Sequence, residues 1–355
     1  MGIVQSNKIG RLTNIQALRG FAALMVVLSH LRTIELKHSG DAILPKITQL
    51  GIFGVDLFFT ISGFIMVYVT WSDERSLRNS TKFLFARATR IYPIYWLIAI
   101  FVFIAWSKYP VLVNVDPQQT NFIKSFFLWP DNTLPMLKVA WTLIHEMYFY
   151  LIFAFILIFK KKWLMPLLST WVVIVLVGNL AGLAKINPET ALIFNPLGIE
   201  FFLGALAAWI FLKFDNVNGS LIFKLSLVVW LGSIMFIILY MPDEYAGYWQ
   251  RVFLYGLPSA FTIYGLASMD RSGMHLPTWS VRLGDISYSL YLSHVLTLSA
   301  LGYIWSKFTR TDLLDNALAV PVLLAATIIA AGLIWRFAEM PMLKIAKHAK
   351  STLFK

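Results

Sequence analysis

Two ionisable side chains lie eleven residues apart in the first apolar segment of the chain, where they could take part in chemistry. Arg19 and His30 are separated by about three helical turns, so a helix places them on one face, about 16 Å apart along its axis. A buried imidazole can act as a general base, and a cation on the same face can hold an anionic substrate. We therefore interpret His30 as the candidate catalytic base and Arg19 as a donor-binding residue.

Two carboxylates are candidate partners for that base. Asp56 lies in the segment GVDLFFTISGFIM and Glu146 in WTLIHEMYFY, at a membrane depth similar to that of His30. A carboxylate that binds one ring nitrogen fixes the tautomer and leaves the other nitrogen free to accept a proton. We expect Asp56 or Glu146 to orient His30. The same layer includes His145 and Glu200, for which interhelical hydrogen bonds are the more ordinary interpretation.

A second polar group, which includes Arg19, is expected nearer the cytoplasmic face. Arg87 and Arg90 share a helix face in FLFARATRIYPIYW, and paired guanidinium groups suit the oxygens of a phosphate. Each arginine taken alone could equally anchor the protein at lipid headgroups. Near the end of the chain, IWRFAEMP contributes Arg336 and Glu339, which are one helical turn apart and could pair with each other.

Two further residues are expected to support the site. His294 lies in LGDISYSLYLSHVLT, whose serines and tyrosines are typical of a cavity lining or of hydrogen bonds between helices. Tyr92 follows Arg90 in the third apolar segment. The loop 108–138 combines aromatic and polar side chains, which suits a sugar surface and equally the aromatic belt of a membrane protein.

The elements that must position these side chains are membrane-spanning helices. Of 355 residues, 58% are hydrophobic and 14% charged, against about 25% charged in an ordinary soluble domain. The mean hydropathy is +0.70. This composition excludes a soluble enzyme and predicts one all-α integral membrane domain without an additional soluble domain. Ten apolar runs of roughly spanning length lie near 12–33, 51–72, 91–107, 139–159, 163–181, 196–213, 221–241, 252–268, 286–305 and 317–339.

The basic residues indicate the orientation of the chain. The net charge is +12, and the lysines and arginines concentrate in alternate loops, on the side of the N-terminal segment. The positive-inside rule then places both termini in the cytoplasm, so the basic excess predicts topology and no nucleic-acid partner. The chain contains no cysteine, which excludes a thiol nucleophile and a thiolate metal site. We expect no metal cofactor.

Taken together, the quoted segments resemble the membrane-bound acyltransferase 3 family, especially its exopolysaccharide and O-antigen O-acetyltransferase members. The resemblance rests on LRGFAALMVVLSH, GVDLFFTISGFIM, FLFARATRIYPIYW, WTLIHEMYFY, LGDISYSLYLSH and FAEMP, in family order from about residue 12 to 341. It implies a bundle of about ten helices, with Arg19 and His30 as the essential pair and with Glu339 and the arginines Arg87 and Arg90 as supporting residues.

The resemblance also implies the reaction and the partners. A cytoplasmic acyl-CoA, usually acetyl-CoA, would donate its acyl group to a hydroxyl of an exported polysaccharide or of its lipid-linked precursor. The partners would be the acyl-CoA, the glycan acceptor, membrane lipids and proteins of polysaccharide assembly, in a bacterial cytoplasmic (inner) membrane. A transporter or flippase for a lipid-linked sugar is the alternative, because buried charges also serve substrate and proton relay sites.

Overall fold

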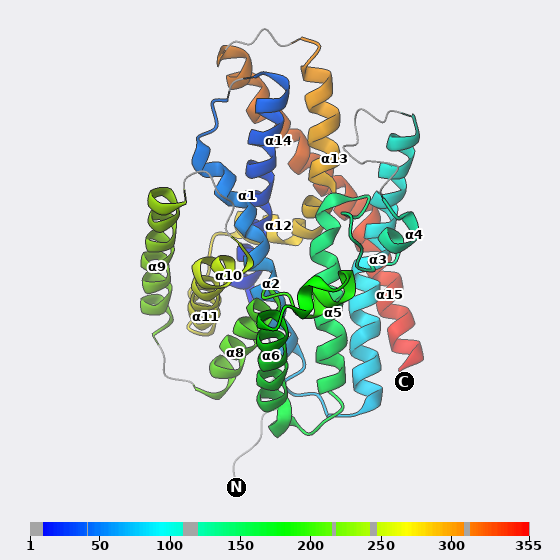
Figure 1. Cartoon of the computed structure of the whole chain (residues 1–355), viewed down its shortest axis with the longest axis vertical. Coiled ribbons are helices and arrows are strands. Elements are labelled where there is room, and N and C mark those ends of the chain that lie inside the picture. Colours follow the sequence, from blue (N-terminus) through cyan, green and yellow to red (C-terminus); the bar gives the residue numbers. More distant parts are fainter. Residues whose placement is uncertain are drawn as a thin grey trace.

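The computed structural model describes residues 10–40, 42–108, 120–214, 218–241, 247–308 and 313–354. These residues form helices joined by turns and short loops, and no strand occurs among them. Figure 1 shows their arrangement. The α-helices are α1 (Thr13–His38), α2 (Gly54–Val69), α3 (Leu77–Lys108), α4 (Phe122–Phe126), α5 (Trp141–Ile156), α6 (Leu164–Leu180), α7 (Pro188–Ile193), α8 (Gly198–Lys213), α9 (Gly219–Tyr240), α10 (Tyr248–Arg251), α11 (Leu257–Arg271), α12 (Thr278–Asp285), α13 (Ser287–Trp305), α14 (Leu313–Ile334) and α15 (Met340–Leu353).

The helix lengths confirm an all-α multi-pass membrane protein. Nine segments of the described chain are long and apolar enough to cross a bilayer, and each overlaps one of the ten expected runs. The remaining run, 286–305, forms α13, a helix of 19 residues. Its serines, tyrosines and histidine interrupt the apolar residues of this helix, and Ser287–His294 are all buried inside the bundle. The polar residues of α13 therefore face protein.

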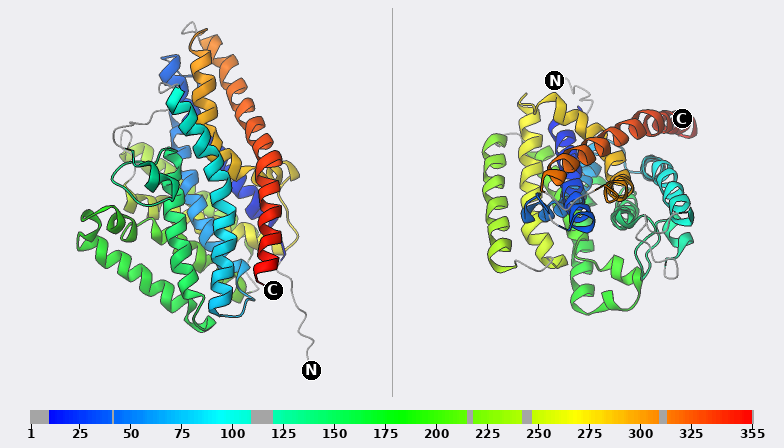
Figure 2. Two further views of the ribbon diagram at one scale, coloured as in Figure 1. Left: turned by 90° about the vertical axis from the view of Figure 1, so that its right-hand side faces the viewer. Right: turned by 90° about the horizontal axis from the view of Figure 1, so that it is seen from above.

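Helix α1 lies near the centre of the bundle. It packs against α2, α12 and α13, which come from opposite ends of the sequence. Figure 2, seen from above, places α1 among these helices, with α9 beside α11 at the edge of the molecule. The candidate residues on α1 can therefore contact side chains from both halves of the chain.

Two glycines allow α2 and α8 to approach closely. A methyl group at Gly63 would lie 1.9 Å from the carbonyl oxygen of Phe201, and one at Gly204 would lie 1.9 Å from that of Thr60. Small residues at such positions let helix backbones meet inside a membrane, where packing takes the place of the hydrophobic effect. This contact fixes α2, which carries Asp56, against the second half of the bundle.

Candidate active site

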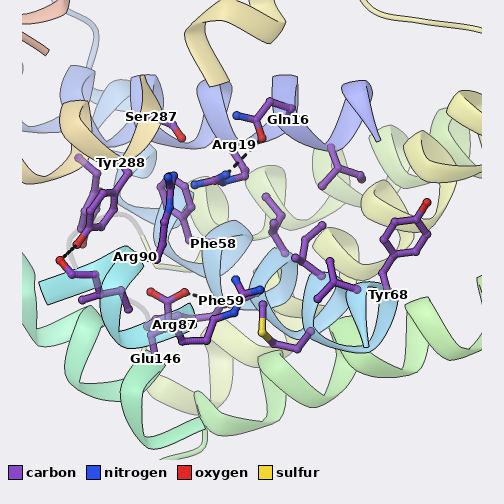
Figure 3. A pocket seen from close by; sticks show the side chains of 18 of the residues that line it. Gln16, Arg19, Phe58, Phe59, Tyr68, Arg87, Arg90, Glu146, Ser287 and Tyr288 are labelled. Atoms are coloured by element: carbon purple, nitrogen blue, oxygen red, sulfur yellow. Dashed lines mark hydrogen bonds between the residues drawn. The ribbon is translucent and has the colours of Figure 1, made fainter. Parts of the chain in front are cut away.

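A cavity of about 440 Å³ lies among α1, α2, α3, α5 and the start of α13. We call it the arginine cavity because Arg11, Arg19, Arg87 and Arg90 line it, together with Glu146. Its lining includes residues from the range 10–19, which leads into the start of α1, and residues from the range 55–69 of α2. The cavity therefore follows these two antiparallel helices. Figure 3 shows Arg19, Arg87 and Arg90 around one space, with Glu146 beside Arg87.

Two of the cavity's arginines keep their charge available. Within the described residues, neither Arg19 nor Arg87 forms an ion pair with a carboxylate. The guanidinium of Arg19 donates only to the side-chain oxygen of Gln16, at 3.3 Å. That of Arg87 lies over the rings of Phe83 and Tyr150, 5.5 and 5.9 Å from their centres. Because a partly buried cation is stabilised by a counter-charge, this pair of arginines favours an anionic ligand.

Arg90, by contrast, is paired within the protein. Its Nη1 lies 2.9 Å from a carboxylate oxygen of Glu339, whose side chain is fully buried. The other carboxylate oxygen of Glu339 accepts a hydrogen bond of 2.6 Å from Ser289. The expected alternative, a pair between Arg336 and Glu339, is not formed, since Arg336 is exposed. Both lie in a π-helical turn, Trp335–Glu339, whose wider spacing turns Glu339 inward and leaves Arg336 outside.

Glu146 belongs to the arginine cavity. It accepts a hydrogen bond of 2.7 Å from Ser62 on α2 and another from Tyr150, one turn further along α5. The hydroxyl of Tyr150 also lies 3.1 Å from that of Ser62. These bonds hold the carboxylate on the cavity wall, where it lies close enough to Arg19 to interact with its charge. The structure thus places Glu146 with the arginines and not beside His30.

His30 and His294 form a pair of imidazoles. Their ring centres are 4.9 Å apart and the rings meet edge to face. In each residue Nδ1 lies within hydrogen-bond distance of backbone carbonyls, at 2.9 Å from Val26 for His30 and at 2.7 Å from Tyr291 for His294. A carbonyl can only accept, so in both rings Nδ1 carries the proton and Nε2 holds a free lone pair. Nε2 of His294 is buried and has no hydrogen-bond partner among the residues that the structure describes.

The imidazole pair lies next to the arginine cavity. The ring centres of His294 and Tyr291 are 5.9 Å apart, and Tyr291 lines the cavity. The hydroxyl of Tyr291 is 2.9 Å from that of Thr142, which lines the cavity as well. Tyr291 therefore separates the imidazoles from the space that the arginines surround.

The expected carboxylate partner of His30 is not found in the part of the chain that the structure describes. Asp56 instead receives two hydrogen bonds of 3.0 Å, from Nε and Nη2 of Arg251. Asp56 is fully buried and Arg251 is 11% exposed. A bidentate guanidinium satisfies both carboxylate oxygens better than an imidazole could, and the Val26 carbonyl takes the orienting role at His30. Glu200, also fully buried, is a close electrostatic neighbour of this pair.

The residues predicted from the sequence thus lie in the arginine cavity, in the imidazole pair, in the ion pair of Asp56, or outside all three. Tyr92 is outside the cavity lining, and its hydroxyl donates to the carbonyl of Phe127 at 3.1 Å. Sequence reasoning missed Arg251, which ends α10 directly before the expected run 252–268, and Tyr150, whose position one turn after Glu146 was a usable signal. No group of three or more histidine, aspartate or glutamate side chains that could hold a metal occurs among the described residues.

The sequence of this chain is similar to those of known proteins. Residues 12–336 match the acyltransferase domain of the acyltransferase 3 family. The chain belongs to this family and is a multi-pass membrane acyltransferase. The family implies an acyl donor.

Three relatives illustrate the family. The chain is 31% identical over 265 residues to the exopolysaccharide production protein ExoZ of Rhizobium meliloti (strain 1021), covering 70% of this chain and 77% of the relative. It is 27% identical to nodulation protein 10 of Rhizobium leguminosarum bv. viciae, over 97% of both chains. A Staphylococcus aureus (strain COL) protein, whose name proposes an O-acetyltransferase, is 23% identical over 97% of this chain and 59% of its own. No solved structure matches significantly.

Proposed function

We propose that this acyltransferase moves an acetyl group from acetyl-CoA to a hydroxyl of an exported polysaccharide or of its lipid-linked precursor, in a bacterial cytoplasmic membrane. The names of the relatives support a polysaccharide acceptor and O-acyl transfer. The observation that carries the proposal is the arginine cavity, in which Arg19 and Arg87 have no ion-pair partner in the described chain, next to a pair of imidazoles with free lone pairs.

The donor would enter the arginine cavity from its basic side. The cavity lining reaches Arg11 before α1 and Tyr68 near the end of α2, on the side where basic loop residues concentrate. The phosphates of CoA would bind the guanidinium groups of Arg19 and Arg87, because guanidinium forks match phosphate oxygens. His30 lies about 16 Å further along α1, a distance suited to an extended acyl-carrying arm. The thioester would then lie near Tyr291.

His30 would serve as the base. Its Nε2 would take the proton of the acceptor hydroxyl while that oxygen attacks the thioester carbon. The carbon–sulfur bond then breaks, and the departing thiolate takes the proton back from the imidazolium to give free CoA. In the alternative route, Nε2 itself receives the acyl group and passes it to the acceptor. A strict requirement for both substrates before CoA release favours the first route, and CoA release without acceptor favours the second.

Binding and transfer can be measured on the protein in liposomes. Titration with acetyl-CoA should show binding that weakens in Arg19→Ala, and radiolabel should move from acetyl-CoA to a lipid-linked glycan extract. Because the chain contains no cysteine, the thiol of released CoA can be followed without protein background. Failure to bind any acyl-CoA in folded protein would overturn the proposal and favour the transporter.

A further inference from the structure

A second cavity, of about 530 Å³, lies apart from the arginine cavity and shares no residue with it. Its lining combines aromatic rings, amides, an imidazole, a guanidinium, the ammonium group of Lys185 and the carboxylate of Asp131, which is paired with Lys124, and it comes from three stretches that are far apart in the sequence. We call it the amide cavity, and its polar and aromatic lining includes Asn132, Trp141, His145, Asn187, Tyr248 and Arg251.

The amide cavity lies on the other side of the membrane from the mouth of the arginine cavity. Its lining comes from the loop before α5, from the connection between α6 and α8, and from α10 before α11. Successive spans alternate in direction, so these three connections share one side. The start of α1 and the end of α2, where the arginine cavity has Arg11 and Tyr68, share the opposite side. The two cavities therefore face opposite compartments.

The start of α5 separates the two cavities, because neighbouring residues on two of its faces line one cavity each. At the start of α5, Thr142 and Glu146 line the arginine cavity, while Trp141 and His145 line the amide cavity. The His145 ring also stacks on Phe59, at 5.9 Å between ring centres, and Phe59 lines the arginine cavity. The His145 and Phe59 rings thus lie between the two cavities, and each ring lines one of them.

The polar groups of the amide cavity suit a neutral ligand rich in hydroxyls. Asp56 balances the charge of Arg251 and binds its Nε and Nη2, which leaves Nη1 as an available donor. The guanidinium is also held over the ring of Trp141, 5.6 Å from its centre. Nδ1 of His145 lies 3.0 Å from the Trp141 carbonyl, so the buried Nε2 is an acceptor, and it has no partner in the described part of the chain. Fixed donors, acceptors and aromatic faces are the means by which a concave site orients a polar ligand.

We propose that the amide cavity binds a saccharide unit of the acceptor, with Arg251 and His145 as the polar groups that orient it. This inference rests on the proposed function for the acceptor's role. The donor then stays on one side of the wall and the saccharide on the other, and only the reacting groups meet. The cavity's size lies within the range of about 300–1,000 Å³ that is typical of ligand sites.

The absence of cysteine permits a direct test. Ala191, on α7, lines the cavity, and Lys138 is exposed on the same side without lining it. Ala191→Cys and the control Lys138→Cys would each be treated with a bulky membrane-impermeant maleimide, and excess reagent would be removed before assay. Modified Ala191→Cys should transfer acetyl to the glycan extract about tenfold less than before modification, with unchanged acetyl-CoA binding. The modified control should retain its transfer.

A second measurement does not depend on acyl transfer. Methyl glucoside and methyl galactoside at high concentration should slow maleimide labelling of Ala191→Cys and leave that of Lys138→Cys unchanged. Unimpaired transfer after full modification of Ala191→Cys would overturn the inference, as would a loss of acetyl-CoA binding on modification. If the wild type binds no acetyl-CoA, the proposed function fails, and protection by the glycosides still decides whether the cavity takes a saccharide.

Discussion

His30 on α1 and His294 on α13 meet edge to face, with 4.9 Å between ring centres, although 264 residues separate them in the sequence. Each ring is fixed by a backbone carbonyl at Nδ1, so each presents Nε2 as a base. We expect the two rings to share the proton that His30 takes from a hydroxyl, which would stabilise the imidazolium. The catalytic role of the pair remains a prediction.

This arrangement predicts that His294 assists His30 through its nitrogen and not only through packing. His294→Phe keeps an aromatic ring against His30 but removes the lone pair, so we expect kcat to fall about tenfold or more and the pH profile of kcat to shift. His294→Ala should be no more active. An unchanged rate and pH profile in His294→Phe would limit His294 to packing.

The unpaired arginines predict an effect on donor affinity. Removing a charge-assisted hydrogen bond costs about 1.5–3 kcal/mol, so Arg19→Ala and Arg87→Ala should each raise KM for acetyl-CoA by about tenfold or more. Steady-state kinetics across acetyl-CoA concentration would test this. A KM for acetyl-CoA that is unchanged in both variants would indicate that these arginines bind lipid headgroups and not the donor.

The inward turn of Glu339 predicts that the two charged residues of the last apolar segment behave differently. Glu339→Ala leaves Arg90 without its carboxylate and Ser289 without its acceptor, so we expect a lower melting temperature and weaker acetyl-CoA binding. Arg336→Ala, at an exposed position, should change neither. Equal effects in the two variants would contradict the assignment.

The ion pair of Asp56 and Arg251 predicts a structural role for Asp56. Removing one partner of a buried pair typically costs about 3–5 kcal/mol, because the other charge stays buried and unpaired. Asp56→Ala should therefore lower the melting temperature strongly. The double variant with Asp56→Leu and Arg251→Met should recover much of that stability and still bind acetyl-CoA. If acetyl-CoA binding is lost in the stable double variant, Asp56 serves the donor site as well.

The sequence predicted the spans well because bilayer thickness imposes a length of apolar chain on every helix. It predicted α13 from the same length rule, even though buried serines and tyrosines interrupt the apolar residues of that helix. It also placed Arg19, Arg87 and Arg90 in one group, and the structure brings them to one cavity.

The pairings were harder to predict. Asp56 binds Arg251 across 195 residues, a contact that depends on how the end of α10 lies against α2 and leaves no local pattern. The inward position of Glu339 depends on a π-helical turn, which has no periodic signal. The carbonyl partner of His30 is its own helix backbone at Val26, whereas sequence reasoning considered only side chains.

The central claim is that His30 is the base for acyl transfer from acetyl-CoA. The most direct test compares the wild type with His30→Ala, and with His348→Ala at an exposed position as the control, for CoA release and label transfer in liposomes. We predict that His30→Ala loses about a hundredfold or more of the rate while acetyl-CoA binding persists, and that His348→Ala is unaffected. Near-normal transfer by folded His30→Ala would contradict the account.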